Sequence, residues 1–383
     1  MTSPLVRGGL RPMRPRDPTE PHRAASSLEL FFDLTFVVGV SVAATSLLHA
    51  EADGLRGGLL PFLVAFFSVW WPWVNFTWFA SAFDTDDWLY RALTVLQMGG
   101  VLIVAAGIPR FVESGDLTVP VVGYVVMRLA LVVQWLRSAR APEYRTTAIR
   151  YAGGVALVQS CWALLLAVPP GLRTAGVLLL VAAELAVPVW AEHRRTTPFH
   201  RRHIAERYGL FTLIVLGEGL LSVWTALNGA QGSTRGADLV LLGATALVLV
   251  AGMWWVYFSR PSPVAGAAMR GTFAYGYGHY VVFGSAAALA AGLELAIEHL
   301  ADEHDGAVAV TAAATVPLAL FLLSTWALVL RHALGPVARV ALPVVAVLCA
   351  LAALVPAGLQ VAALLVVAAV VVLEVDARRR AAS

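Results

Sequence analysis

Two carboxylates at the start of the first apolar stretch could do proton chemistry. Glu29 and Asp33 lie four residues apart, which on a helix places them on one face while Phe31 and Phe32 cover the neighbouring face. Two such acids repel each other in low dielectric, so one would hold a proton or both would need a cation or an arginine partner. Glu29 also has a simpler interpretation, as a first-turn acid behind a helix cap at Ser26–Ser27. Asp33, one turn deeper, is the stronger candidate for a catalytic acid, and Glu29 is a candidate for substrate binding.

A second acidic group follows the second apolar stretch. Asp84, Asp86 and Asp87 precede Arg91 by a few residues. Clustered carboxylates suit Mg²⁺, which takes oxygen ligands and is often shared with the phosphates of a substrate. Arg91 could bind a substrate phosphate or pair with the acids themselves. The three carboxylates are thus a candidate Mg²⁺ site, and a plain helix cap is the alternative.

A third constellation combines a histidine, an arginine and two glutamates. His203 and Arg207 lie four residues apart, and Glu206 lies three residues after His203, so the spacing favours a shared helix face. The spacing is not His-Glu-x-x-His, which argues against a metalloprotease. Glu218 lies deeper between two glycines and, once buried, could donate or relay a proton. His203, Glu206 and Glu218 are candidate catalytic residues, and Arg207 is a candidate substrate ligand.

Charged residues inside apolar stretches are costly in hydrocarbon, so each is a candidate functional residue. Arg128 and Glu184 join Glu29, Asp33 and Glu218 in this class. We assign Arg128 to catalysis; the alternative is that it pairs with Glu218 and holds two helices in register. Further polar and aromatic side chains are expected to bind substrate, namely Asn75, Gln97, Trp254, Tyr257 and His279.

The elements that must position these residues are membrane-spanning helices. The chain is 59% hydrophobic and 13% charged, and its mean hydropathy is +0.76. Such a composition cannot provide the surface of a soluble protein. We therefore predict an all-α, polytopic membrane bundle of about twelve helices. The predicted spans are 30–50, 59–81, 93–110, 117–136, 151–168, 172–190, 208–228, 237–258, 273–297, 308–330, 338–354 and 357–374.

The distribution of arginine predicts how the helices are oriented. All 27 basic residues are arginine, and most lie in the tail 1–27, in the loops 137–150 and 192–207, and at 378–380. Because basic loops stay in the cytoplasm, both termini are predicted to be cytoplasmic. These arginines would face anionic headgroups, which accounts for the high pI without a nucleic-acid partner. We expect a multi-pass protein of the inner (plasma) membrane, with membrane lipids and an amphiphilic small molecule as partners.

Paired motifs indicate two related halves. The tryptophans of Trp70–Trp73 and Trp254–Trp255 lie at equal depth six spans apart, as do Thr118–Pro120 and Thr315–Pro317. An offset of six spans would give both halves the same orientation, with a site at their interface. Chance similarity between apolar helices is the alternative. The predicted parts are the tail 1–27 and the halves 28–195 and 196–383, which together form one membrane domain.

Most of the charged residues inside the predicted spans lie toward the cytoplasmic side. Glu29, Asp33, Glu184 and Glu218 fall in the cytoplasmic half of their spans, and Arg128 falls near the middle. We therefore predict a single cavity that opens to the cytoplasm.

In these motifs the chain resembles the low temperature requirement protein A family of bacterial membrane proteins. Thr35 and Gly219 depart from that pattern, because family members usually have Val and Ser there. The resemblance implies a polytopic membrane protein and leaves the reaction open; Glu184 lies outside the shared motifs. The motifs are Glu29–Leu34, Phe83–Asp87, Gln97–Met98, Gly123–Tyr124 with Arg128, His203 with Glu206–Phe211, Leu216–Glu218, and Trp254–Trp255 with Tyr257–Phe258.

Three functions fit these features. The first is a membrane-embedded enzyme that acts on an amphiphilic lipid or isoprenoid, with Asp33 or Glu218 supplying a proton and aromatic rings stabilising cationic character, as in acid-initiated terpene cyclisation or prenyl chemistry. The second is a proton-coupled secondary transporter with buried acids paired to Arg128. The third is a structural or stress-related membrane protein whose polar cluster locks helices together. We favour the enzyme narrowly, because the aspartate cluster, Arg91 and the aromatic residues suit an amphiphilic anion better than a proton path.

Overall fold

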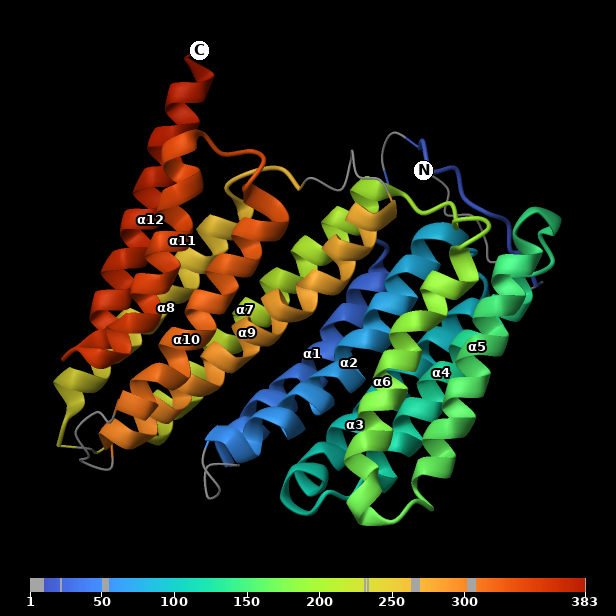
Figure 1. Cartoon of the computed structure of the whole chain (residues 1–383), viewed down its shortest axis with the longest axis horizontal. Helices are drawn as coiled ribbons and strands as arrows, with labels where there is room; N and C mark the ends of the chain where they lie inside the picture. The colour runs from blue at the N-terminus through green and yellow to red at the C-terminus, as the bar shows by residue number, and fades with distance from the viewer. Residues whose placement is uncertain are drawn as a thin grey trace, which may run out of the picture. The chain divides into compact units, whose positions relative to one another are not determined.

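The computed structural model is built from helices joined by short loops (Figure 1). It describes residues 10–20, 23–49, 55–230, 232, 234–262, 269–301 and 308–382, and no strand occurs among them. Twelve of the helices in these ranges are long and apolar enough to cross a membrane. The predicted all-α, polytopic fold is therefore confirmed.

Most of the twelve helices extend beyond their predicted spans. Hydropathy detects only the stretch that lies in hydrocarbon, whereas polar residues at its ends continue the same helix. One helix thus begins at Arg145 instead of at 151, and another at Arg201 instead of at 208. The helices are α1 Ser27–His49, α2 Leu55–Phe83, α3 Trp88–Ser114, α4 Thr118–Ser138, α5 Arg145–Leu165, α6 Pro170–Glu192, α7 Arg201–Gly229, α8 Gly236–Phe258, α9 Met269–Ala301, α10 Val308–Thr325, α11 Pro336–Leu351 and α12 Gly358–Ala381.

The chain divides into two compact units. Unit 1 consists of Met1–Val42 and Phe67–Arg207, and unit 2 consists of Ala43–Phe66 and Tyr208–Ser383. The boundaries fall inside α1, α2 and α7, so each of these helices contributes residues to both units. Most of the predicted first half belongs to unit 1, and most of the second half belongs to unit 2.

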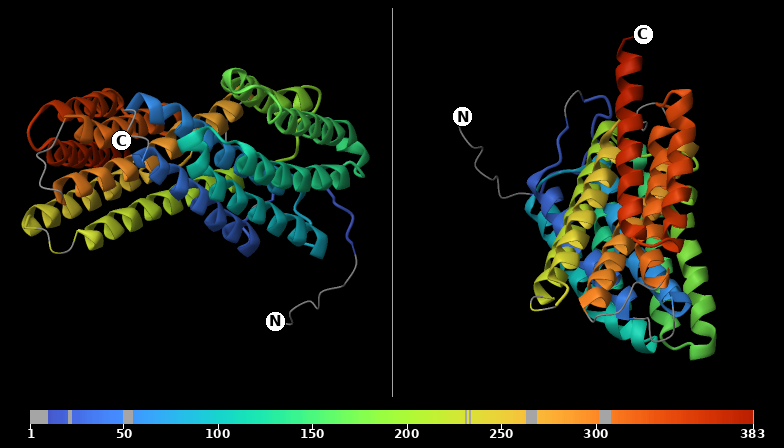
Figure 2. Two further views of the ribbon diagram at one scale, coloured as in Figure 1. Left: turned by 90° about the horizontal axis from the view of Figure 1, so that it is seen from below. Right: turned by 90° about the vertical axis from the view of Figure 1, so that its left-hand side faces the viewer.

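In unit 1, α3 to α6 pack in chain order, each against the next (Figures 1 and 2). Glycines let α3 and α4 approach closely. A side-chain carbon on Gly107 would lie 2.4 Å from Pro120, and one on Gly123 would lie 2.6 Å from the backbone oxygen of Gly100. Small residues at such contacts are typical of membrane helices, because lipid gives no hydrophobic driving force between helices and close packing must supply the attraction.

In unit 2, α9 to α12 also pack in chain order, and α12 returns to contact α8. α9 approaches α10 closely at Gly292, where an added side-chain carbon would clash with the backbone oxygen of Ala313. The order of neighbours from α9 to α12 matches the order from α3 to α6, as a repeat of six helices requires. The repeat and the cytoplasmic location of both termini stay predictions.

Candidate functional site

A capping box at the start of α1 fixes Glu29. The hydroxyl of Ser26 accepts a hydrogen bond from the backbone N–H of Glu29 at 3.2 Å. In return, Oε2 of Glu29 accepts one from the backbone N–H of Ser26 at 2.8 Å. This exchange satisfies two donors that the first turn of a helix leaves free. It also leaves the second carboxylate oxygen of Glu29 to face α7.

Asp33, one turn deeper, is bound on two sides. Arg207 donates to both carboxylate oxygens, from Nη2 to Oδ1 at 2.5 Å and from Nε to Oδ2 at 3.1 Å. The indole N–H of Trp73 donates to Oδ1 at 2.6 Å. All three side chains are fully buried. Arg207, predicted as a substrate ligand, is thus the bidentate partner of Asp33, an arrangement that fixes the geometry of both groups.

The second oxygen of Glu29 faces three cationic or polar groups. Arg207 Nη1 lies 2.9 Å, His203 Nε2 lies 3.2 Å and Arg23 Nη2 lies 3.9 Å from Oε1 of Glu29. The contacts of Oε1 with Arg207 and His203 are short, but their angles are poor for hydrogen bonds. In the described parts of the chain, Nδ1 of His203 and the hydroxyl of Tyr90 also have no hydrogen-bond partner. Buried polar groups normally have one, so these atoms could bind a polar group of a ligand. The charge cluster is Glu29, Asp33, His203 and Arg207.

Aromatic rings lie beside the charge cluster. Phe32, the neighbour of Asp33, stacks on Phe36 with ring centroids 4.3 Å apart and meets Phe76 at 4.1 Å. Phe76 in turn lies 6.2 Å from Tyr90. All four rings are buried, and the face of an aromatic ring attracts positive charge. This aromatic wall, defined as Phe32, Phe36, Phe76 and Tyr90, places an electron-rich apolar surface next to two buried acids.

The three aspartates between α2 and α3 are each bound by a different arginine. The nearest nitrogen–oxygen distances are 3.3 Å for Asp84–Arg16, 2.7 Å for Asp86–Arg91 and 2.5 Å for Asp87–Arg137. Asp87 also caps α3 by accepting a hydrogen bond from the backbone N–H of Tyr90 at 2.8 Å. Among the described residues no three His, Cys, Asp or Glu side chains are grouped to hold a metal. The residues therefore do not fit the predicted Mg²⁺ site, and Asp87 matches the alternative of a helix cap.

The surroundings shift the pKa values of two of these aspartates in opposite directions. Burial and the negative charge of Glu29 raise the pKa of Asp84, although Arg23 opposes this. Burial also favours the neutral form of Asp87, but its hydrogen bond from Arg137 and those from backbone N–H groups outweigh that effect and lower its pKa. Asp84 therefore takes up a proton at a higher pH than Asp87.

The N-terminal tail closes over the end of α2. The backbone N–H of Arg16 donates to the carbonyl of Ala82 at 2.9 Å. The guanidinium of Arg23, 3% exposed, donates to the carbonyls of Ala80 and Ser81. Sequence reasoning gave these arginines only a role in topology. The acidic loop after α2 was the available signal that some of them would fold back onto the membrane domain.

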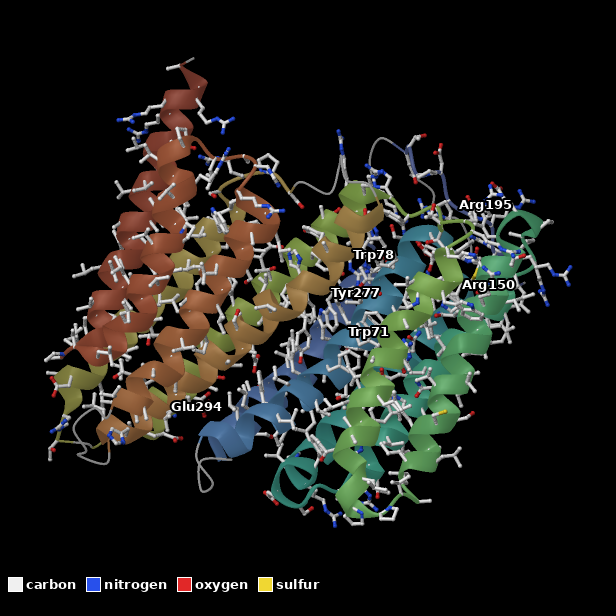
Figure 3. All side chains as sticks on the ribbon, viewed as in Figure 1. Trp71, Trp78, Arg150, Arg195, Tyr277 and Glu294 are labelled. Carbon is white, nitrogen blue, oxygen red and sulfur yellow. The ribbon has the colours of Figure 1, made fainter. Side chains whose placement is uncertain are left out.

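A second buried ion pair lies in unit 1. Arg128 Nη2 donates to Oε2 of Glu184 at 2.8 Å. Trp71, which lies on the α6 side of α2 (Figure 3), donates to the same oxygen at 3.0 Å, and Gln159 of α5 donates to Oε1 at 2.6 Å. The structure pairs Arg128 with Glu184, whereas Glu218, the predicted alternative, belongs to unit 2. Sequence alone could not rank the two glutamates, because each is a single acid in an apolar span.

Three other predicted residues of unit 1 have different surroundings. Gln97 donates to the side chain of Gln134 at 3.1 Å, and Asn75 donates to the carbonyl of Trp71 at 2.9 Å. Glu206 is exposed and accepts a hydrogen bond from the backbone N–H of Ala25 at 3.3 Å. The structure therefore joins His203 and Arg207 to Glu29 and Asp33, while Glu206 points away to the surface.

The remaining predicted residues belong to unit 2. His279 Nε2 lies 2.9 Å from the hydroxyl of Tyr257, and Nδ1 lies 2.7 Å from the carbonyl of Tyr275. Trp254 is exposed on α8. Glu218 is half-buried on α7 and has no ion pair or hydrogen bond among the residues that the structure describes. The predicted site residues are thus distributed over several clusters.

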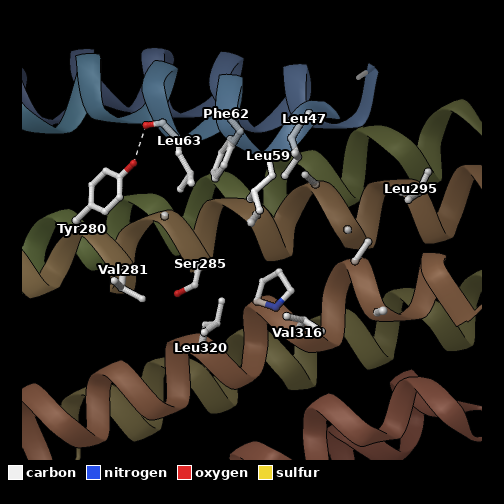
Figure 4. A pocket seen from close by; sticks show the side chains of 18 residues that line it. Leu47, Leu59, Phe62, Leu63, Tyr280, Val281, Ser285, Leu295, Val316 and Leu320 are labelled. Carbon is white, nitrogen blue, oxygen red and sulfur yellow. Dashed lines mark hydrogen bonds between the residues drawn. The ribbon is translucent and has the colours of Figure 1, made fainter. Parts of the chain in front are cut away.

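Unit 2 also contains an apolar groove between the start of α2, α9 and α10 (Figure 4). Its volume is about 480 Å³, and it follows α9 from Tyr280 to Leu295, roughly 22 Å by helical rise. Two hydroxyls at the groove already donate to backbone carbonyls, Tyr280 to Leu63 at 2.6 Å and Ser285 to Val282 at 3.0 Å. The groove is therefore lined almost entirely by apolar side chains, and these two hydroxyls already have partners.

Known proteins similar to this chain point to one bacterial family. The family model described as bacterial low temperature requirement A protein matches residues 24–375. An uncharacterized protein of Rhizobium meliloti (strain 1021) is 26% identical over an alignment of 293 residues. This alignment covers 72% of this chain and 70% of that relative. The range matched by the family model includes the charge cluster, the Arg128–Glu184 pair and the groove.

Proposed function

The chain belongs to the bacterial low temperature requirement A family, and from that premise we propose that it is a membrane-embedded enzyme acting on an amphiphilic lipid or isoprenoid in the inner (plasma) membrane. The position of Asp33 carries the proposal, because this buried carboxylate is held by Arg207 and Trp73 and directly follows Phe32 of the aromatic wall in the chain. A positioned acid can move a proton, and aromatic faces stabilise the positive charge that forms. Acid-initiated cyclisation and prenyl chemistry belong to this class of reaction.

Arg207 would couple substrate binding to the proton chemistry. It contacts both Asp33 and Glu29 within the charge cluster. An anionic headgroup that competes for Arg207 would leave two buried carboxylates short of a cation, and a proton on one of them would restore the balance of charge. Arg16 and Arg23, both near Asp84, would supply further positive charge to that headgroup.

The groove in unit 2 independently favours an amphiphilic ligand. Its lining along α9 and α10 is almost entirely apolar, and its length approaches the thickness of the hydrocarbon core. A lipid or isoprenoid chain is the kind of molecule that such a groove would hold. Membrane lipids are accordingly the proposed partners of this surface.

Turnover by the purified protein tests the enzyme proposal. In detergent micelles with long-chain isoprenoid diphosphates and alcohols as probes, the wild type is expected to release products detectable by mass spectrometry. Asp33→Asn keeps the shape of the side chain but removes the charge, so turnover should fall by about 100-fold or more. Asp116→Asn, in the loop before α4, is the control and should keep full activity. Unchanged turnover in Asp33→Asn would contradict the role assigned to that residue.

A proton-coupled secondary transporter is the second candidate. It is favoured by the acids within spans, namely Glu184 paired with Arg128 and the half-buried Glu218, because such acids serve as proton carriers in transporters. Uptake of a labelled amphiphile into proteoliposomes should then depend on a pH gradient and be lost in Glu218→Gln. If Asp33→Asn and Glu218→Gln change neither turnover nor uptake, the polar residues have the structural role that was the third hypothesis.

A further inference from the structure

The Arg128–Glu184 pair lies in the middle of the spans of unit 1. Arg128 is the central residue of the span Thr118–Ser138, so about 15 Å of helix separates it from either end. Its side chain is 1% exposed and that of Glu184 is 0% exposed. Charges at this depth are expensive, and a functional role is the usual reason for keeping them.

The two partners differ in how fully their hydrogen-bonding groups are used. Glu184 accepts three hydrogen bonds, from Arg128, Trp71 and Gln159. Arg128 donates from Nη2, whereas its Nε and Nη1 have no partner in the part of the chain that the structure describes. An unmet buried donor destabilises the folded protein. The guanidinium therefore presents unused donors to its surroundings.

Two further donors lie nearby, on α4 and α5. The indole N–H of Trp162, one turn after Gln159 on α5, has no partner within the described ranges, and the hydroxyl of Tyr124, one turn before Arg128 on α4, faces the carboxylate of Glu184 without the geometry of a good hydrogen bond. The ring centroids of Tyr124 and Trp162 lie 5.8 Å apart. The guanidinium carbon of Arg128 lies 5.9 Å from the centroid of the Tyr124 ring. Around this buried cation the described residues thus have more unmet donors than unmet acceptors, and Oε1 of Gln159 is one such acceptor.

We propose that Arg128, Tyr124 and Trp162 form an anion site that binds a small monovalent anion together with one proton on Glu184. While Glu184 is ionised, it neutralises Arg128 and an anion gains little. A proton on Glu184 leaves the charge of Arg128 unbalanced in apolar surroundings, and an anion bound to the unused donors restores neutrality. This inference goes beyond the proposed enzyme activity and does not rest on it.

The contacts of Glu184 in unit 1 identify it as the group that takes the proton. The titratable or charged groups that face it are Arg128 and Tyr124 of α4. The other helices in contact contribute uncharged side chains, Trp71 from α2 and Gln159 from α5. Arginine keeps its proton in proteins, and the Tyr124 hydroxyl is already protonated at neutral pH. One proton on the Glu184 carboxylate therefore balances one anion on Arg128.

Anion binding at controlled pH tests the proposal with the full-length protein in detergent. Chloride, nitrate and formate are the probes, and gluconate at the same ionic strength is the control for size. The wild type is expected to bind a small anion about tenfold more tightly for each pH unit of acidification. In unbuffered solution it should take up one proton for each anion bound. Glu184→Gln removes the titrating group, so binding should persist without pH dependence or proton uptake.

Two further variants separate the anion site from general effects. Glu192→Gln is the matched control, because Glu192 is a buried acid on the same helix that is held by Tyr151 and Thr197; it should keep the wild-type pH dependence. Trp162→Phe removes one donor and should weaken binding about tenfold. Absence of saturable binding, or equal proton uptake in Glu184→Gln and the wild type, would overturn the proposal. Binding that neither Glu184→Gln nor Trp162→Phe alters would mean an adventitious ion only.

Discussion

Asp33 and Asp86 are both paired with arginine, but their surroundings differ. Asp33 is 0% exposed and receives hydrogen bonds from two residues of different helices, whereas the side chains of Asp86 and Arg91 are 57% and 55% exposed. Water screens an exposed pair, so that it contributes at most about 1 kcal/mol. Loss of one partner of a buried pair leaves an uncompensated charge and costs about 3–5 kcal/mol. Burial therefore predicts a clear order among the acids of this protein.

Asp33→Asn is expected to lower the free energy of unfolding by about 3 kcal/mol, because Arg207 and the indole N–H of Trp73 lose a buried, charged acceptor, although Glu29 still faces Arg207. Asp86→Asn should cost less than about 1 kcal/mol. Unfolding titrations in mixed micelles measure both values. Equal costs for Asp33→Asn and Asp86→Asn would contradict the order given by burial.

Asp87 is expected to make stability depend on pH in the acid range. Its pKa in the folded protein is lowered by Arg137 and by its backbone hydrogen bonds, which outweigh the effect of burial. The stabilisation is therefore complete above the unfolded-state pKa of about 3.9 and is lost as the pH falls through the lower folded-state value. Asp87→Asn keeps a good helix cap but removes the charge. The difference in Tm between the two proteins should shrink as the pH is lowered below about 4; a constant difference would exclude this role for the charge.

Residue types and spacing identified the buried charges but not their partners. Glu29, Asp33 and Arg128 were found because a charge in an apolar span is conspicuous in one sequence. Asp33 lies 174 residues from Arg207, and Arg128 lies 56 residues from Glu184. No local pattern links residues so far apart, and only the folded helices decide which cation meets which acid.

Among the elements, the N-terminal tail helps to hold the fold together, although its described residues before Ser27 form no helix. A helix leaves its last four carbonyls without partners in its own backbone. In α2 the carbonyls of Ala80, Ser81 and Ala82 are met by groups of Arg16 and Arg23. The tail therefore acts as the cap of α2.

The helices themselves, by contrast, were predictable from the sequence. The helix predicted over 237–258 is α8, which spans Gly236–Phe258, because hydropathy over one span is a local property.

Docking of the tail should protect it from trypsin. Arg23 is buried against α2, whereas Arg194 is exposed after α6, so cleavage after Arg194 should precede cleavage after Arg23. Asp84→Asn weakens the hold on the tail, because Asp84 is the acid near both Arg16 and Arg23. Cleavage after Arg23 should then be about fivefold faster, in proportion to the opened fraction. Mass spectrometry of the fragments over time measures both rates.

Asp86→Asn is the matched control for the protease experiment. It removes an acid from the same loop, but the partner of Asp86 is Arg91 and not the tail. Its cleavage rate after Arg23 should equal that of the wild type. If both variants speed cleavage equally, a general loosening of the loop is responsible and the tail is not held by Asp84.

At the scale of the whole molecule, arginine is concentrated at one end of each unit. In unit 1, Arg150 and Arg195 lie at the same end of the bundle (Figure 3), next to α4, α5 and α6, and Asp116 lies in the loop at the other end of α4. In unit 2 the last turn of α12 carries Arg378, Arg379 and Arg380. Arginine-rich ends are retained in the cytoplasm. The predicted orientation therefore assigns each loop to a definite side of the membrane.

Single cysteines test that assignment. In a variant with Cys161 and Cys349 replaced by alanine, a cysteine at Asp116 or at the exposed Val355 should react with a membrane-impermeant maleimide in cells whose inner membrane is intact. A cysteine at Arg194 or Arg378 should react only after that membrane is permeabilised. The fully reversed pattern would place both termini outside. Because the eight helices α4 to α11 separate Asp116 from Val355, these positions must face the same side if every one of them crosses. Opposite labelling at these two positions would therefore mean that an odd number of those helices fails to cross, and the twelve-span topology would be wrong.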